Sequence, residues 1–290
     1  LVLLYSASGA IGSSLFSNYQ YFFINQSMRL FVGIALLFLV SFIDYRIYKK
    51  HHKTILYLCW VLIFLGYLTS QHLPTSRGII ISGRNIVTTS DLSKFALVVF
   101  LASFIEINRR NINNLKILSV ELLPYIFFTL LMIFFQPDMS TTFTISIILL
   151  LMIYIAGINF KYIAYTLCTS LFIVLIKIMV TPYQRIRFSN WYYSVDDGQN
   201  AASILSLSNG GFLGLGLGES SFKKGLLPAV HTDFILPIIG EEFGFLGIMS
   251  IFILFFLFLF LTMRILQRVQ DTFGFFLGMG IVLNVICYFL

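Results

Sequence analysis

Charged residues are scarce in this chain. Only 11% of its 290 residues are Asp, Glu, Lys or Arg, whereas 58% are hydrophobic. A soluble domain carries roughly 25% charged residues. The composition therefore excludes an ordinary water-soluble globular protein and predicts a chain that lies mostly in lipid.

Cysteine is almost absent as well. The three cysteines, Cys59, Cys168 and Cys287, each lie within an apolar run and share no paired spacing. We expect them to act as small apolar side chains in helices, which excludes a disulfide framework or a cysteine metal site. The net charge is +7, but the basic residues flank apolar segments rather than lining one soluble face. No nucleic-acid partner is therefore expected.

Long apolar runs fill most of the chain, and a helix needs about 20 mainly apolar residues to span a bilayer. The runs that meet this measure are the end of a first helix at 1–10 and the segments 28–45, 54–69, 92–107, 117–135, 142–158, 162–180, 233–263 and 272–290. They predict an all-α polytopic membrane protein with about nine spanning helices, organised as one membrane-embedded domain over residues 1–290. Because the chain has no initiator Met and both its ends lie inside apolar runs, we expect a fragment that lacks material at both ends.

The segment 233–263 is longer than one straight span requires. It holds Pro237 near its start and Gly244 and Gly247 further along. Helices break or kink at such residues. We expect a short re-entrant or interfacial piece, a break near Pro237 or at Gly244–Gly247, and then a full helix.

Lysine and arginine concentrate in alternate short loops. Those loops are 46–53, 108–116, 159–161 and 264–271. Because cytoplasmic loops carry the excess of Lys and Arg, we place these four in the cytoplasm. The loops 11–27, 70–91, 136–141 and the large loop 181–232, between the seventh and eighth helices, are then extracytoplasmic.

The extracytoplasmic loops still hold cations, which are expected to be sparse on that side. These are Arg77, Arg84, Arg185, Arg187, Lys223 and Lys224. One interpretation is ordinary surface charge balanced by nearby acidic residues. The other is a site that holds an anionic group at the outer membrane face, which we favour because four of the six lie in the large loop beside Asp233.

The functional interpretation of the sequence depends most on the stretch 209–247. This stretch begins rich in glycine and runs through His231-Thr232-Asp233 straight into apolar sequence. An ionisable group where a polar loop meets a membrane segment is costly unless something uses it. We interpret Asp233 as a catalytic base at the outer mouth of a membrane enzyme, with N-capping of the following helix as the alternative.

Several short motifs occur in the same order as in one known family. They are Ser6-Ala7-Ser8, Arg77 with Gly83, Ser90-Asp91-Leu92-Ser93-Lys94, Gln136-Pro137-Asp138-Met139-Ser140-Thr141, Ala156-Gly157, Pro182-Tyr183-Gln184-Arg185-Ile186-Arg187, Gly210-Gly211, Gly214, Gly216, Lys223, Leu227-Pro228, His231-Thr232-Asp233-Phe234 and Glu241-Glu242. Each motif is weak alone. The ordered set resembles the SEDS (shape, elongation, division and sporulation) glycosyltransferases, the FtsW/RodA group, and its glycine pattern is closer to the division member. The chain departs from the family at Ala229, where the family has Glu.

The resemblance implies a ten-helix fold in the full protein and a peptidoglycan glycosyltransferase. Such an enzyme polymerises lipid II, the undecaprenyl-pyrophosphate-linked disaccharide pentapeptide, into glycan strands. The resemblance also implies a bacterial cytoplasmic membrane protein with an extracytoplasmic active site. Its implied partners are a class B penicillin-binding transpeptidase and other membrane proteins of the divisome or elongasome.

The implied reaction assigns roles to the charged residues of the outer loops. A sugar hydroxyl attacks an anomeric carbon, and Asp233 as general base would contribute about 10²–10⁴-fold to the rate. The leaving pyrophosphate gains negative charge, which cations or a metal must face. The cations assigned to it are Lys223, Lys224, Arg185, Arg187 and Arg77. No ligand spacing indicates a metal site, although a divalent cation such as Mg²⁺ or Mn²⁺ is compatible with the chemistry.

Four polar residues near Asp233 are assigned supporting roles. His231 and Thr232 are expected to support the turn that holds Asp233. Glu241 and Glu242 follow Asp233 at membrane depth, where a carboxylate faces a partner or a polar cavity. For these two glutamates we favour pairing with Arg or Lys over catalysis.

Two further features of the outer loops admit two interpretations each. Asp138 lies at an outer helix junction, where it either caps the helix or lines the site. Gly210 and Gly211 allow close backbone approach to a ligand, and tight packing or hinge turns would need glycine equally. The site-lining interpretation of Asp138 and the ligand-approach interpretation of the two glycines add these residues to the site.

Two functions from other classes compete with the enzyme. A flippase that moves lipid II across the bilayer would need polar groups through the whole membrane depth, whereas here they concentrate at the outer ends of the helices. A non-enzymatic scaffold of the cell-wall machinery would leave Asp233 dispensable. Glycan-strand synthesis by the protein reconstituted with its partner separates the enzyme from both.

Overall fold

The structure is a computed structural model that describes residues 19–70, 78–81, 84–135, 139–180, 185–186, 188–189, 199–220 and 235–289. Its contacts group the chain into two compact units, Leu1–Ile43 with Ile186–Phe260, and Asp44–Arg185 with Leu261–Leu290. We call them the first and the second unit and describe each by itself. Whether they form the single domain expected from the sequence stays a prediction.

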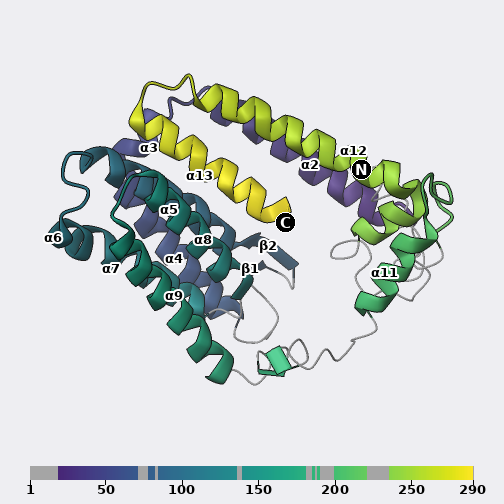
Figure 1. Cartoon of the computed structure of the whole chain (residues 1–290), viewed down its shortest axis with the longest axis horizontal. Helices are drawn as coiled ribbons and strands as arrows, with labels where there is room; N and C mark the ends of the chain where they lie inside the picture. The colour runs from purple at the N-terminus through teal and green to yellow at the C-terminus, as the bar shows by residue number, and fades with distance from the viewer. Residues whose placement is uncertain are drawn as a thin grey trace. The chain divides into compact units, whose positions relative to one another are not determined.

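The second unit contains most of the described helices. They are α3 (Arg46–Lys50), α4 (His52–Ser70), α5 (Thr89–Ile107), α6 (Leu115–Ile117), the π-helical turn η1 (Leu118–Leu122), α7 (Leu123–Phe135), α8 (Met139–Ile155), α9 (Phe160–Val180) and α13 (Thr272–Phe289). Figure 1 shows these helices arranged around α5. α5 contacts α3, α4, α7, α8 and α13, so it is the central helix of the unit.

The core of the second unit forms around α5 because that helix is buried on every side between Ala96 and Ile105, where Ser103 is the one polar residue. Phe100 and Leu101 are buried in it, and they share one hydrophobic core with Met152 of α8. Close approach of α13 depends on Gly280, since a Cβ there would lie 2.4 Å from Val98. Small residues allow this close helix packing in membrane proteins.

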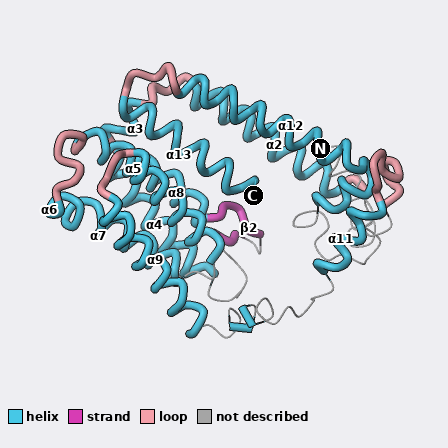
Figure 2. The backbone as a smooth tube through the Cα atoms, viewed as in Figure 1, coloured by secondary structure: helices cyan, strands magenta, loops and turns pink. Residues whose placement is uncertain are grey.

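A short antiparallel hairpin precedes α5. It consists of β1 (Gly78–Ile81) and β2 (Arg84–Thr88), and its register shifts between Ile79 and Ile80. Figure 2 shows it as the magenta element beside the helices of this unit. The sequence prediction placed these residues in an irregular outer loop, so the hairpin is a local exception to an otherwise helical fold.

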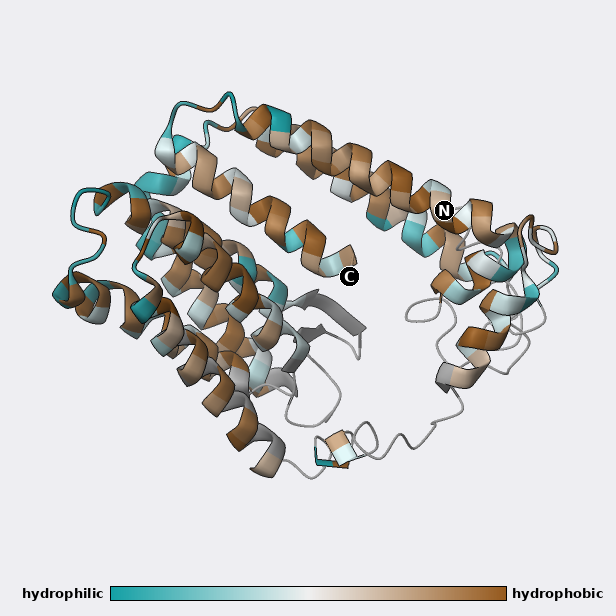
Figure 3. Ribbon diagram, viewed as in Figure 1, coloured by the Kyte–Doolittle hydropathy of each residue, from teal (hydrophilic) through white to brown (hydrophobic). Residues whose placement is uncertain are grey.

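Polar contacts join the loops at one end of the second unit. They are an ion pair of 2.8 Å between Lys49 and Glu106, a hydrogen bond of 2.8 Å from the Asn159 amide to Asn113, and one of 3.0 Å from Arg109 to Thr272. All four loops that were predicted to be cytoplasmic therefore lie at the same end. Figure 3 shows that these loops are hydrophilic and that the helices between their ends are hydrophobic.

The first unit contains α2 (Tyr21–Ser41), α11 (Gln199–Asn209) and most of α12 (Ile235–Leu266). α12 is interrupted at Gly244, whose φ of 64° and ψ of −161° are not helical. The predicted break is confirmed at the second of its two expected positions. Pro237 instead lies in the first turn of α12. The amides of a first turn have no acceptor within the helix, so a proline there costs no helical hydrogen bond.

The exposed surface of the helices is apolar. Among the described residues, four segments are long and apolar enough to cross a membrane: Tyr21–Ser41, Leu115–Ile133, Ile235–Leu266 and Thr272–Phe289. Exposed side chains such as Phe31, Leu37 and Phe258 match a lipid solvent. The prediction of an all-α, multi-pass membrane protein is confirmed.

Candidate functional site

Most residues that the sequence assigned to the active site lie outside the described residues. These are Arg77, Asp138, Arg187, Lys223, Lys224, His231, Thr232 and Asp233. The structure does place Arg185, Gly210, Gly211, Glu241 and Glu242. Four of these five lie in the first unit, and only Arg185 belongs to the second.

Arg185 is exposed, and its guanidinium donates a hydrogen bond to the carbonyl of Met179. Met179 is in the last turn of α9, where the carbonyl groups lack helical donors. Arg185 therefore caps the C-terminus of α9, and a cation there also complements the helix dipole. Its contact with a pyrophosphate stays a prediction.

Glu241 is fully buried, with an exposed fraction of 0%. Its Oε2 accepts a hydrogen bond of 3.3 Å from Ser206 of α11, and another from Ser220. The Ser206 hydroxyl also lies 3.1 Å from the carbonyl oxygen of Pro237. A buried carboxylate requires such donors, because an ion taken out of water without them is costly. The expected pairing of Glu241 with Arg or Lys stays a prediction.

The loop after α11 lies against the break in α12. The amides of Leu215 and Gly216 donate to the carbonyls of Glu241 and Glu242, at 2.9 and 3.0 Å. In the other direction, the amide of Phe245 donates to the carbonyl of Gly211 at 3.0 Å. The loop and the broken helix thus exchange backbone hydrogen bonds.

Two glycines make this close approach possible. A Cβ on Gly210 would lie 1.8 Å from the carbonyl oxygen of Gly240. A Cβ on Gly214, which has a φ of +83°, would lie 2.2 Å from the carbonyl oxygen of Glu242. Gly210 therefore serves tight packing, the second of its two interpretations. Gly211 has a φ of +53° and open space around it, so its contact with a ligand stays a prediction.

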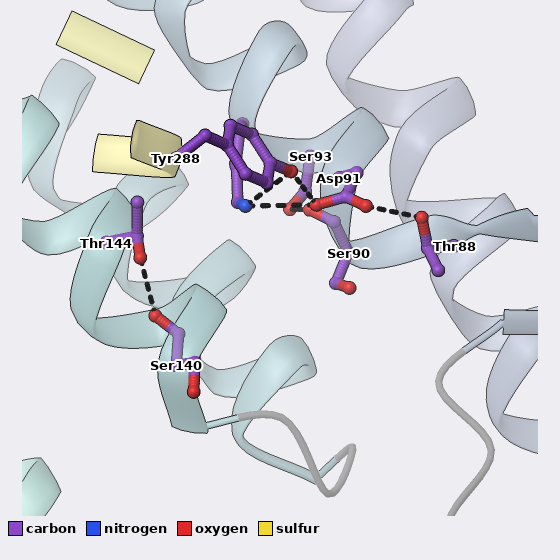
Figure 4. A network of polar contacts seen from close by, with 8 residues as sticks. Thr88, Ser90, Asp91, Ser93, Ser140, Thr144 and Tyr288 are labelled. Carbon is purple, nitrogen blue, oxygen red and sulfur yellow. Dashed lines mark hydrogen bonds and ion pairs between the residues drawn. The ribbon is translucent and has the colours of Figure 1, made fainter. Parts of the chain in front are cut away.

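A second polar cluster lies in the second unit, where β2 leads into α5 (Figure 4). The Lys94 Nζ lies 3.0 Å from Asp91 and 2.8 Å from the Tyr288 hydroxyl of α13. Asp91 also accepts hydrogen bonds from Thr88 and Tyr288. Lys94 is 4% exposed and Asp91 42%, so the cluster presents a carboxylate while its ammonium group is buried.

Sequence reasoning did not assign this cluster to a site. The available signal was the i,i+3 spacing of Asp91 and Lys94, which places opposite charges on one helix face. Tyr288 could not be found in this way, because it is distant in the sequence and only the packing of α13 on α5 brings it close.

Two other features bear on ligand binding. A cavity of about 330 Å³ in the second unit is lined by Ile105, Arg109, Asp271, Thr272 and Phe275 among others, at the end that holds the predicted cytoplasmic loops. Within the described residues, no three His, Cys, Asp or Glu side chains are grouped to hold a metal ion. The divalent cation considered from the sequence stays a prediction.

Comparison with known proteins identifies a family. The model of the FtsW/RodA/SpoVE family, described as cell cycle proteins, matches residues 1–290. The probable peptidoglycan glycosyltransferase FtsW of Geobacter sulfurreducens is 32% identical over an alignment of 292 positions that covers 97% of this chain and 77% of the relative. The stage V sporulation protein E of Bacillus subtilis is 28% identical over an alignment of 289 positions that covers 97% of this chain and 79% of that protein.

Solved structures show the same fold. A chain from a peptidoglycan synthase complex that coordinates polymerization and crosslinking matches with a TM-score of 0.70, at 19% identity, over 98% of this chain and 81% of that chain. The rod shape determining protein RodA of Thermus thermophilus matches with a TM-score of 0.65, at 16% identity, over 98% and 79%. At these identities the likeness concerns the fold alone.

Proposed function

The chain belongs to the FtsW/RodA/SpoVE family of cell cycle proteins, and we propose that it is a peptidoglycan glycosyltransferase that polymerises lipid II with Asp233 as its general base. The observation that carries this proposal is the match over the whole chain to relatives named as probable peptidoglycan glycosyltransferases. Within the chain, the sequence His231-Thr232-Asp233 immediately before the membrane helix α12 supports Asp233 as the reacting carboxylate.

The proposed reaction forms one glycosidic bond and breaks the bond between an anomeric carbon and the oxygen of the lipid pyrophosphate. A sugar hydroxyl attacks the anomeric carbon of a second glycosyl unit, and the lipid pyrophosphate leaves from that carbon. Asp233 takes the hydroxyl proton, which contributes about 10²–10⁴-fold when the carboxylate is within hydrogen-bond reach.

Cations are proposed to face the leaving pyrophosphate. Lys223, Lys224, Arg185 and Arg187 belong to the large outer loop 181–232, and Arg77 belongs to the outer loop 70–91. A positive charge close to a developing anion lowers the barrier most when the site excludes water. A divalent cation such as Mg²⁺ or Mn²⁺ would act in the same way, and loss of activity on chelation that either metal restores would support it.

The setting of the reaction is also part of the proposal. The protein acts in the bacterial cytoplasmic membrane, with its site on the extracytoplasmic face. Its partner is a class B penicillin-binding transpeptidase within the divisome or elongasome. The fold shared with a chain from a peptidoglycan synthase complex that couples polymerization to crosslinking supports this partner.

Replacement of the proposed base tests the function. The full-length Asp233→Asn protein, purified with its transpeptidase partner, is expected to polymerise lipid II about 10²–10⁴-fold more slowly than the wild type. The assay measures the length and amount of glycan strands by gel electrophoresis. Asn preserves the size and the capping ability of Asp, so the loss would report on proton transfer rather than on helix capping.

Glu219→Gln is the matched control, because it removes an exposed carboxylate from the same loop. It is expected to polymerise at the wild-type rate. Unchanged strand synthesis by Asp233→Asn would refute the general base. Transfer of lipid II between leaflets without any strand would instead identify a flippase.

A further inference from the structure

The break in α12 exposes backbone groups that an unbroken helix would pair. In a continuous α-helix, the amides of Phe245 and Leu246 would donate to the carbonyls of Glu241 and Glu242. Here those amides donate to Gly211 and Phe212 of the loop, at 3.0 and 3.3 Å. We call residues 210–216 the loop insert, because they occupy the place of the missing helical hydrogen bonds.

The carbonyl groups freed by the same break are satisfied by the loop insert as well. The carbonyls of Glu241 and Glu242 accept hydrogen bonds from the amides of Leu215 and Gly216. Four backbone hydrogen bonds therefore fix the register between the insert and α12. The register is further constrained because Gly244 and Gly214 face each other so closely that a Cβ on Gly244 would lie 2.4 Å from the Gly214 amide nitrogen.

The side chain of Glu241 secures the chain on both sides of the loop insert. Ser206 precedes the insert on α11 and Ser220 follows it, and both hydroxyls donate to the same carboxylate oxygen. All three residues are buried, with exposed fractions of 0%. One carboxylate thus joins α11, the end of the loop and α12.

The position of these contacts in the chain connects them with the reaction. Ser220 immediately precedes the segment 221–234, and α12 begins at Ile235, immediately after it. Lys223, Lys224 and Asp233 all belong to that segment. The segment 221–234 thus begins next to Ser220, which is hydrogen-bonded to α12, and it ends where α12 begins.

We propose that Glu241 is a positioning residue for glycosyl transfer, which holds Ser206 and Ser220 on α12 and so fixes where the chain enters and leaves the segment that carries Asp233. The inference rests on the proposed role of Asp233. Glu241 does not take part in the bond changes. It acts through geometry, because a displacement of about 1 Å of a catalytic group can lower a rate about 100-fold.

Kinetics of three variants test the proposal in the full-length protein purified with its partner. Glu241→Ala is expected to lower kcat for lipid II polymerisation about 10- to 100-fold, with a smaller change in KM. Glu241→Gln keeps an oxygen that accepts from both serines, so it is expected to restore most of the lost kcat. Ser220→Ala removes one of the two donors and is expected to lower kcat less than Glu241→Ala. It leaves no buried charge without a donor set, so it keeps the test possible if Glu241→Ala does not fold.

Ser208→Ala is the matched control, because Ser208 lies on the same helix as Ser206 but, among the described residues, its hydroxyl donates to the Leu205 carbonyl of its own helix. It is expected to retain the wild-type kcat. Wild-type kcat in both Glu241→Ala and Ser220→Ala would overturn the proposal. A Glu241→Gln protein as inactive as Glu241→Ala would also overturn it, because that result would indicate proton transfer by Glu241. If Asp233→Asn is fully active, the proposed function fails; if only Asp233→Asn is inactive, the positioning role alone fails.

Discussion

At the scale of single residues, the glycines of the first unit show how a loop is fitted to a broken helix. Gly210 and Gly214 lie so close to carbonyl oxygens of α12 that a Cβ on either residue would clash with them. The positive φ of Gly214 adds a second reason for glycine, because L-residues with a Cβ are strained in that region. Their role follows from packing, and no ligand is needed to explain them.

A glycine replacement measures this packing. Gly214→Ala is expected to destabilise the protein by about 2–4 kcal/mol, because it combines left-handed strain with overpacking. Thermal unfolding of the detergent-solubilised protein reports the change as a lower Tm. Gly33→Ala is the control, since Gly33 lies on α2 with open space around it, and there alanine is expected to be neutral or stabilising. Equal Tm values for the two variants would contradict the packing role.

At the scale of elements, the pairing of α5 with α13 combines close apolar packing with a polar cluster. Gly280 allows the helices to approach, and Tyr288 places its hydroxyl on Lys94 and Asp91. Lys94 also lies 4.0 Å from the centre of the Tyr288 ring, which adds a cation–π contact. The end of α13 is thereby tied to the start of α5.

Removal of the Tyr288 hydroxyl tests the polar part of this contact. Tyr288→Phe keeps the ring over Lys94 but deprives two charged groups of a hydrogen bond, which is expected to cost about 1.5–3 kcal/mol. The Tm of the purified protein is the measurement. Tyr154→Phe provides the comparison, because the Tyr154 side chain is exposed on α8, and it is expected to leave the Tm unchanged. A Tyr288→Phe protein as stable as the wild type would show that the hydroxyl contributes nothing.

At the scale of the whole molecule, the alternation of basic loops predicts which ends of the helices face the cytoplasm. The contacts among Lys49, Glu106, Arg109 and Thr272 place these loops at one end of the second unit. The Asp91–Lys94 cluster lies at the other end of α5 from Glu106. The second unit thus agrees with an alternating topology, and the side of the membrane that each end faces stays a prediction from charge.

Thiol labelling in spheroplasts tests that assignment. In a protein whose three cysteines are replaced by serine, Glu219→Cys is expected to react with a membrane-impermeant maleimide, because the large loop is placed outside. Asn111→Cys is expected to react only after permeabilisation, since its loop is placed in the cytoplasm. The reverse pattern would invert the topology and move the proposed site to the wrong face for cell-wall synthesis.

The sequence by itself determined the class of the molecule, because spanning helices need long apolar runs and every such run is visible in one dimension. It also limited the break in α12 to two positions, near Pro237 or at Gly244–Gly247, and the structure has it at Gly244, where glycine readily adopts non-helical φ and ψ. The order of motifs led to the family without any knowledge of the fold. The proposed base, Asp233, was assigned in the same way and stays a prediction.

Only the tertiary structure decided which distant residues meet. Glu241 accepts hydrogen bonds from Ser206 and Ser220, and Lys94 donates one to Tyr288, through packing that no local pattern encodes. The hairpin of β1 and β2 was missed for a related reason, because strand pairing depends on a partner as well as on the β-branched residues of each strand. A hydrophobic pattern specifies which face of an element is buried, whereas polar contacts between elements depend on the three-dimensional positions of their side chains.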